Sequence, residues 1–202
     1  MKLNLPNRLT LVRMVMVPFL MVFIAFDFGL GVWSRLIAAA FFGAAALTDT
    51  LDGRIARKQG IVTNFGKFLD PLADKLMVFV ALISLCWTTG RDEGESLYGI
   101  LLLVATVIVI FRELAVTSMR MVVNNTDGVV IAANILGKVK TVTQVVFVLT
   151  ALLEAVIWEI CGVAPLGGHL LSYLTMAAMT VMTVWSGVSY FKSYWNYINP
   201  AK

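Results

Sequence analysis

The sequence contains one histidine, two cysteines and few charged residues, since Asp, Glu, Lys and Arg make up 14% of its 202 positions. The single histidine, His169, is far in sequence from the aspartates at 49–74. This separation argues against histidine catalysis and against a zinc site of the usual nitrogen or sulfur type. Cys86 and Cys161 fall near the outer ends of apolar stretches, where a disulfide is chemically allowed. Isolated cysteines among lipid-facing helices more often behave as small hydrophobic residues.

Apolar residues dominate what is present, at 59% of the chain. A transmembrane helix needs about 20 predominantly apolar residues, and six stretches meet that requirement: Leu9–Phe28, Val32–Arg57, Asn64–Trp87, Leu97–Val123, Lys138–Trp158 and Leu170–Tyr190. The first contains Arg13 and Pro18 and lacks a small-residue cleavage site, so we expect a retained helix. The sequence therefore predicts an all-α integral membrane protein with six transmembrane helices, forming a single domain over residues 1–202.

Basic residues are concentrated on one predicted side of the membrane. They lie before the first span, between spans two and three, between spans four and five, and at the end of the chain. The positive-inside rule places these segments, and therefore both termini, in the cytoplasm. The net charge of +4 follows from this topology and no separate basic domain exists, so we expect no nucleic-acid partner.

Four aspartates occur close together in the segment DTLDGRIARKQGIVTNFGKFLDPLAD, residues 49–74. Asp49 and Asp52 are three residues apart, and Asp70 and Asp74 are four apart, so each pair lies on one helix face. Carboxylates are costly in a membrane and are rarely left without partners. Two helices that each present two carboxylates form an oxygen-rich site suited to Mg²⁺ or Mn²⁺. We expect a polar active-site cavity here that opens to the cytoplasm.

Further residues of this segment fit a ligand site. Gly53 and Gly66 lie on the same helix faces as the aspartates, which allows close approach to the backbone. Arg57 is one turn beyond Gly53 and can donate to a phosphate. The alternatives are that the aspartates pair with Arg57 or its neighbours, that the glycines only pack helices, and that Thr63 is a simple N-cap. The joint occurrence of all these residues favours the site.

The pattern D-x-x-D-G-x-x-A-R, eight residues, then G-x-x-x-D-x-x-x-D resembles the signature of the CDP-alcohol phosphotransferase family. The resemblance implies a bacterial inner-membrane homodimer that uses CDP-diacylglycerol and two divalent ions, Mg²⁺ or Mn²⁺. It implies these roles: Asp49, Asp52 and Asp70 as metal ligands, Asp74 as metal ligand and general base, and Gly53, Arg57, Thr63 and Gly66 as CDP-diacylglycerol contacts. An acceptor hydroxyl needs a positioned base, and no residue suggests a covalent intermediate, so we predict direct in-line displacement of CMP.

Three other segments, LNLPNRLTLVR, FRELAVTSMR and LGKVKTVTQ, resemble the branch of this family that uses sn-glycerol 3-phosphate as acceptor. The phosphate of this acceptor requires cationic donors, and we expect them to be Arg112, Arg120, Lys138 and Lys140. Glu113 is seven residues from Arg120, on the same helix face, and is expected to tether it.

Several alternatives remain open from the sequence. The basic residues of spans four and five could only anchor helix ends at anionic headgroups. Branches of the family that use inositol phosphate or serine, or that form cardiolipin, are alternatives. A six-helix ion-coupled transporter is a more distant one, although the sequence has no internal repeat.

The predicted orientation can be tested by thiol labelling in a variant without Cys86 and Cys161. A membrane-impermeant maleimide should label Asp92→Cys and Gly167→Cys in intact cells. Lys58→Cys and Asp127→Cys should react only after permeabilisation, because the positive-inside rule places them in the cytoplasm. Labelling of Lys58→Cys from outside would overturn the orientation.

Overall fold

The computed structural model consists of six helices. They are α1 (Leu5–Ala25), α2 (Val32–Gln59), α3 (Asn64–Thr89), α4 (Ser96–Thr126), α5 (Ile135–Cys161) and α6 (Leu170–Ile198). The structure describes residues 5–26, 28–59, 64–90, 96–126, 135–162 and 169–198. Within these ranges, side chains are described except at 5–7, 49–59, 64–68, 70, 96, 124–126 and 196–198.

Five of the six helices are long and apolar enough to cross a membrane. Their candidate spans are Arg8–Ala25, Pro71–Thr89, Leu97–Val123, Ile135–Cys161 and Leu170–Trp195. In α2 the described apolar part is the shorter stretch Val32–Thr48, which at 1.5 Å per residue reaches about 25 Å against the roughly 30 Å of a hydrocarbon core. The prediction of an all-α, multi-pass membrane protein is confirmed, and a sixth span through α2 stays a prediction.

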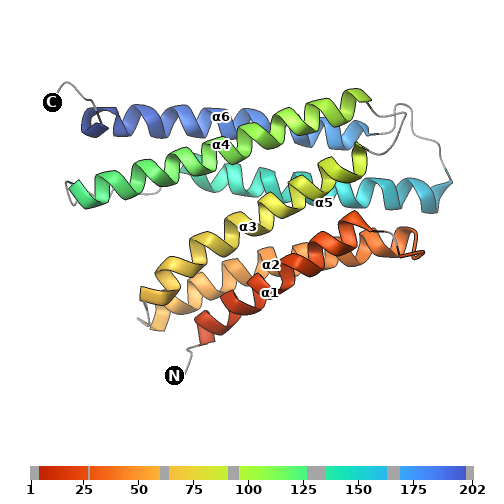
Figure 1. The fold of residues 1–202 in the computed structure, drawn as a ribbon, viewed down its shortest axis with the longest axis horizontal. Coiled ribbons are helices and arrows are strands. Elements are labelled where there is room, and N and C mark those ends of the chain that lie inside the picture. Colours follow the sequence, from red (N-terminus) through yellow and green to blue (C-terminus); the bar gives the residue numbers. More distant parts are fainter. Residues whose placement is uncertain are drawn as a thin grey trace.

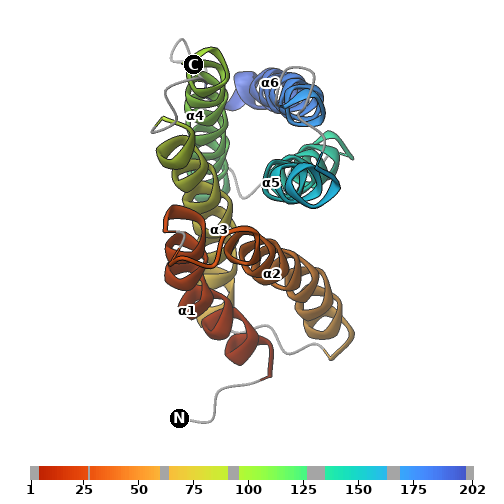
Figure 2. The same ribbon diagram turned by 90° about the vertical axis from the view of Figure 1, so that its right-hand side faces the viewer.

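The helices form two groups that meet along α2, α3, α4 and α5. Helix α1 packs against α2 and α3, while α6 packs against α4 and α5. The groups join through contacts of α2 with α5 and of α3 with α4 (Figure 1, Figure 2). The beginning of α1 and the described ends of α2, α4 and α6 lie at one end of the bundle, on the left in Figure 1. We refer to this as the aspartate end, because the helical segments of the aspartate motif lie there.

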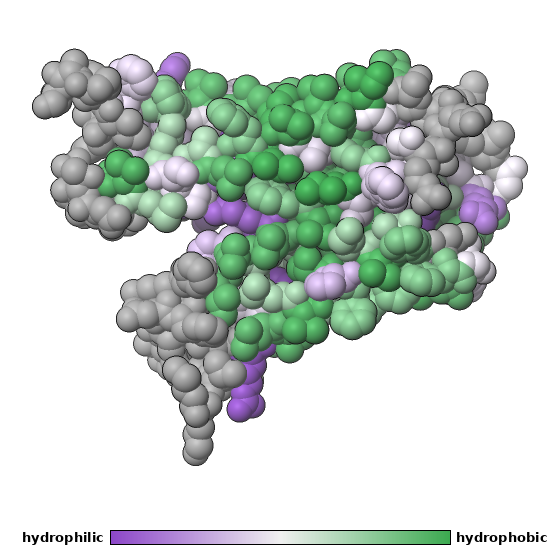
Figure 3. All heavy atoms as spheres, viewed as in Figure 1, coloured by the Kyte–Doolittle hydropathy of each residue, from purple (hydrophilic) through white to green (hydrophobic). Residues whose placement is uncertain are grey.

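Small and medium apolar side chains fill the core. Ala38, Phe42, Ala81, Leu82 and Leu102 are fully buried. Small residues let membrane helices approach closely without help from the hydrophobic effect. Large apolar side chains remain exposed along all six helices, as expected where lipid replaces water (Figure 3).

Some local expectations change in the structure. Helix α1 ends at Ala25, three residues before the predicted Phe28, which adopts a positive φ of 51° in the turn that follows. Pro71 lies inside a continuous α3. Cys86 and Cys161 are both free, so the alternative of a disulfide is wrong.

The first turn of α6 is capped by a carboxylate from α5. Glu154, only 2% exposed, accepts hydrogen bonds from the backbone N–H groups of Leu171 (2.9 Å) and Ser172 (2.8 Å). The Ser172 hydroxyl also donates to it. These backbone donors have no partner within their own helix, and a negative charge is favourable at a helix N-terminus. Glu154 therefore fixes where α6 begins.

We predict that Glu154→Ala destabilises the protein by about 2–4 kcal/mol, because buried N–H groups lose charged acceptors that contribute roughly 1.5–3 kcal/mol each. Thermal unfolding in detergent, followed by circular dichroism, measures the change. Glu159→Ala is the matched control, since Glu159 is exposed on the same helix. Equal melting temperatures for the two variants would contradict this role of Glu154.

Candidate active site

Asp74, the predicted general base, forms an ion pair with a buried arginine. Arg13 Nη1 on α1 donates to Asp74 Oδ1 on α3 across 2.7 Å. The Arg13 side chain is 1% exposed, whereas that of Asp74 is 45% exposed. A buried guanidinium requires an anionic partner, so this contact fixes the carboxylate and ties α1 to α3 at the aspartate end.

The other residues of the aspartate motif lie partly outside the described residues. Helices α2 and α3 carry the backbone of the motif on both sides of the connection between them. The side chains of Asp49, Asp52, Arg57 and Asp70, the helical positions Gly53 and Gly66, and residue Thr63 lie outside the description of side chains. The predicted metal and CDP-diacylglycerol contacts therefore stay predictions.

A second charged cluster surrounds one buried carboxylate between α4 and α5. Glu113, 7% exposed, accepts hydrogen bonds from Arg112 Nη1 (3.1 Å) and from Lys140 Nζ. Arg112 and Lys140 are each 8% exposed. The expected tether between Glu113 and Arg120 is wrong, because Glu113 bonds to the adjacent arginine and to a lysine of the neighbouring helix.

Helix α6 contributes hydroxyl groups and an aromatic ring to this cluster. Arg112 Nη2 donates to Ser186 Oγ (2.5 Å), and Arg120 Nη2 donates to the Tyr190 hydroxyl (2.8 Å). Both guanidinium groups lie over the Tyr190 ring, at 5.4 Å and 5.0 Å from its centroid, within cation–π range. Residues Arg112, Glu113, Arg120, Lys140, Ser186 and Tyr190 are called the cation cluster below.

Two glycines permit this close packing. A Cβ on Gly187 would lie 3.1 Å from Arg112 Cγ, and one on Gly137 would lie 3.1 Å from the Tyr190 hydroxyl. Both distances are shorter than ordinary carbon contacts. The absence of side chains at these positions therefore lets α6 and α5 approach the cluster.

The predicted phosphate-binding residues divide into two groups. The structure brings Arg112, Arg120 and Lys140 together in the cation cluster. Lys138, two positions before Lys140, is exposed, because successive residues on a helix point in different directions. Ser186 and Tyr190 were not predicted, although Thr183, Ser186, Tyr190 and Tyr194 form a buried polar stripe that helical spacing reveals.

Polar atoms without partners gather around the cation cluster. Among the described residues, buried atoms with no hydrogen-bond partner include Nε of Arg112 and Arg120, Nε2 of Gln144 and Oγ1 of Thr183. Gln144 is one turn beyond Lys140 and Thr183 is one turn before Ser186. Buried polar groups usually have a partner, so unused donors beside excess positive charge indicate a site for an anionic, hydrogen-bonding ligand. Figure 3 shows the molecule hollowed at the aspartate end, with hydrophilic side chains inside the recess.

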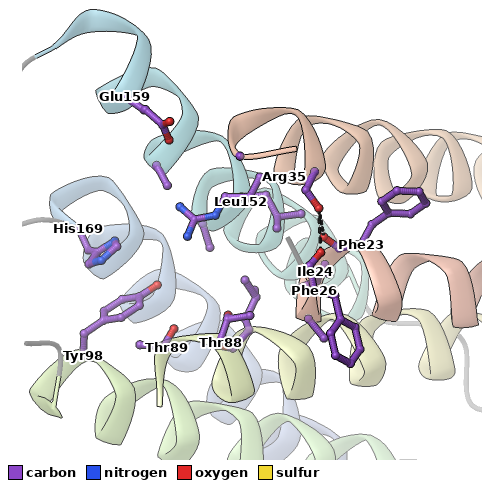
Figure 4. Close-up of a pocket in the computed structure, with 16 residues that line it drawn as sticks. Phe23, Ile24, Phe26, Arg35, Thr88, Thr89, Tyr98, Leu152, Glu159 and His169 are labelled. Carbon is purple, nitrogen blue, oxygen red and sulfur yellow. Dashed lines mark hydrogen bonds between the residues drawn. The ribbon is translucent and has the colours of Figure 1, made fainter. Parts of the chain in front are cut away.

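A cavity of about 770 Å³ lies at the opposite end. Arg35, Glu159 and His169 project toward it, and His169 stacks on Tyr98 at 4.5 Å between ring centroids (Figure 4). Arg35 and Glu159 are exposed, and none of the described buried polar atoms that lack a partner belongs to a residue lining this cavity. Trp158 Nε1, beside Glu159 on α5, is the exception toward this end, and the other described buried atoms without a partner belong to Arg13 or lie in and around the cation cluster.

Comparison with known proteins identifies the family. The chain belongs to the CDP-alcohol phosphatidyltransferase family, whose model matches residues 3–188. It is 38% identical over 204 residues to a CDP-diacylglycerol–glycerol-3-phosphate 3-phosphatidyltransferase of Bacillus subtilis, covering 95% of each chain.

Two further relatives come from distant organisms. A probable phosphatidylglycerophosphate synthase of Mycobacterium tuberculosis is 38% identical over 189 residues, covering 93% of this chain and 79% of the relative. The CDP-diacylglycerol–glycerol-3-phosphate 3-phosphatidyltransferase 2 of Arabidopsis thaliana is 36% identical over 196 residues, covering 96% of this chain and 80% of the relative.

Proposed function

We propose that the chain transfers the phosphatidyl group of CDP-diacylglycerol to sn-glycerol 3-phosphate, which releases CMP and forms phosphatidylglycerophosphate. The names of the similar proteins support this reaction. The observation that carries it is the cation cluster, because an acceptor with its own phosphate needs buried cationic donors beyond those that hold the donor lipid. We place the reaction at the cytoplasmic face of a bacterial inner membrane, in a homodimer.

The cation cluster suits a phosphate monoester better than an uncharged alcohol. Arg112 and Lys140 pair with one carboxylate, Glu113, and Arg120 bonds to the neutral Tyr190 hydroxyl, so the described part of the cluster has excess positive charge in a low-dielectric environment. An isolated buried charge is expensive, and a phosphate dianion would reduce that cost. Guanidinium groups bind phosphate oxygens through charge-assisted hydrogen bonds. Lys138 is exposed at the start of α5 and would assist at the entrance.

The donor lipid is assigned to the aspartate motif. Carboxylate oxygens are the ligands that Mg²⁺ and Mn²⁺ prefer, so Asp49, Asp52, Asp70 and Asp74 fit two such ions. When bound, the ions would neutralise charge on the pyrophosphate. Gly53, Thr63 and Gly66 would line the cytidine diphosphate, and Arg57 would donate to its phosphates.

The proposed reaction is a direct displacement. The primary hydroxyl oxygen of the acceptor attacks the phosphorus that bears diacylglycerol, and the bond from that phosphorus to the bridging oxygen breaks. CMP leaves with the electron pair, and Asp74 takes the hydroxyl proton. Arg13 holds Asp74 Oδ1, which positions the base and contributes to the orientation that such reactions require.

We predict that sn-glycerol 3-phosphate supports the fastest CMP release in a panel with inositol phosphate, serine and glycerol. Arg112→Ala or Arg120→Ala should lower kcat/KM for it by about 10- to 100-fold, since a hydrogen bond to a charged group contributes roughly 1.5–3 kcal/mol. The KM for CDP-diacylglycerol should change little. Arg35→Ala, at the opposite end, is the control. A preference for serine or glycerol would mean that the arginines only anchor helices.

We predict that Asp74→Asn lowers turnover by at least the ~10²–10⁴-fold typical of acid–base groups. It should also weaken Mg²⁺ or Mn²⁺ binding, because a carboxylate ligand becomes an amide. CMP release and metal titration measure the two effects, and EDTA should abolish activity of the unmodified protein. Near-normal turnover of Asp74→Asn would assign the base to another residue.

A further inference from the structure

Lys75 lies between the two charged regions of the site. It follows Asp74 on α3 and is partly buried. Its ammonium group is within electrostatic range of Asp74, and also of Glu113, Arg112 and Arg120 of the cation cluster. Lys75 therefore connects the predicted base with the proposed phosphate pocket.

The geometry of α3 explains this position. Adjacent residues on an α-helix are separated by about 100° around the axis, because one turn contains 3.6 residues. Asp74 faces α1, where it meets Arg13. Lys75 interacts electrostatically with Glu113, Arg112 and Arg120 of α4, and α3 packs against α4 in the bundle. A single turn of α3 therefore presents a carboxylate and an ammonium group to two sides of one recess.

Lys75 differs from the cations of the cluster in its bonding. Arg112 and Lys140 bond to Glu113, and Arg120 bonds to Tyr190. Lys75 forms no hydrogen bond or ion pair with any described residue of the chain. An ammonium group has three donors, and a partly buried one gains most from an anionic partner.

We propose that Lys75 binds the phosphate of the acceptor and sets the distance between that phosphate and the hydroxyl group that reacts at Asp74. This inference rests on the proposed function and adds a residue that selects acceptors by chain length. Because Lys75 and Asp74 are consecutive on α3, the reach of the lysine side chain limits how far apart the two ends of the acceptor can be. We expect the three-carbon spacing of sn-glycerol 3-phosphate to suit this limit better than shorter or longer hydroxyalkyl phosphates.

The test compares 2-hydroxyethyl, 3-hydroxypropyl and 4-hydroxybutyl phosphate as acceptors for CMP release. The unmodified protein should prefer the three-carbon compound. Lys75→Gln should raise KM for sn-glycerol 3-phosphate about tenfold, as loss of one charged hydrogen bond implies. It should also flatten the preference among chain lengths, which a purely structural defect would not do. Lys75→Arg should keep phosphate binding but change which hydroxyalkyl chain length the protein prefers.

Binding can be measured without turnover. Stabilisation of the protein by sn-glycerol 3-phosphate, in EDTA and without donor lipid, should require higher ligand concentrations in Lys75→Gln than in the unmodified protein. Lys192→Gln is the matched control, because Lys192 is an exposed lysine in the last turns of α6. Size-exclusion chromatography shows whether each variant is folded.

The outcomes separate this inference from the proposed function. If the unmodified protein prefers serine or glycerol, the proposed function fails. If it prefers sn-glycerol 3-phosphate, and Arg120→Ala weakens that acceptor while Lys75→Gln leaves its KM and the length preference unchanged, the role of Lys75 alone is overturned.

Discussion

An excess of buried positive charge constrains the whole aspartate end of the molecule. Among the described residues, Lys75, Arg112, Arg120 and Lys140 lie around the carboxylate of Glu113, and Asp74, the other carboxylate near Lys75, is paired with Arg13. These five cations and two carboxylates leave an excess of three positive charges. Such a cluster inside a membrane bundle is stable only where other groups offset its desolvation. Glu113 bonds to cations from both α4 and α5, so this one carboxylate joins the two helices.

Helix α6 offsets this charge with polarisable and hydrogen-bonding groups. Its buried stripe of Ser186 and Tyr190 gives the two arginines a hydroxyl each and a shared aromatic face. Gly187 makes the approach possible. At the other end of the same helix, Glu154 fixes the first turn. The position of Tyr190 therefore depends on contacts at both ends of α6, although only one end takes part in the proposed chemistry.

The sequence predicts the parts of this structure that local patterns determine. Apolar runs predict all six helices, and basic residues in FRELAVTSMR and LGKVKTVTQ predict which helices carry the cation cluster. The sequence does not predict partners across helices, because crossing geometry is a tertiary property. Glu113 was assigned to Arg120 by spacing along one helix, yet it pairs with Lys140 of another. The contact of Arg13 with Asp74 likewise depends on how α1 packs on α3.

The cation cluster already has the arrangement that an anionic ligand would need. Glu113 and Tyr190 hold Arg112, Arg120 and Lys140 in place, so little side-chain entropy remains to be lost when a phosphate binds. Asp74 receives its own hydrogen bond from Arg13 of α1, apart from the cation cluster. In the proposed reaction, this separation would let one recess hold a donor lipid that needs metal cations and an anionic acceptor together.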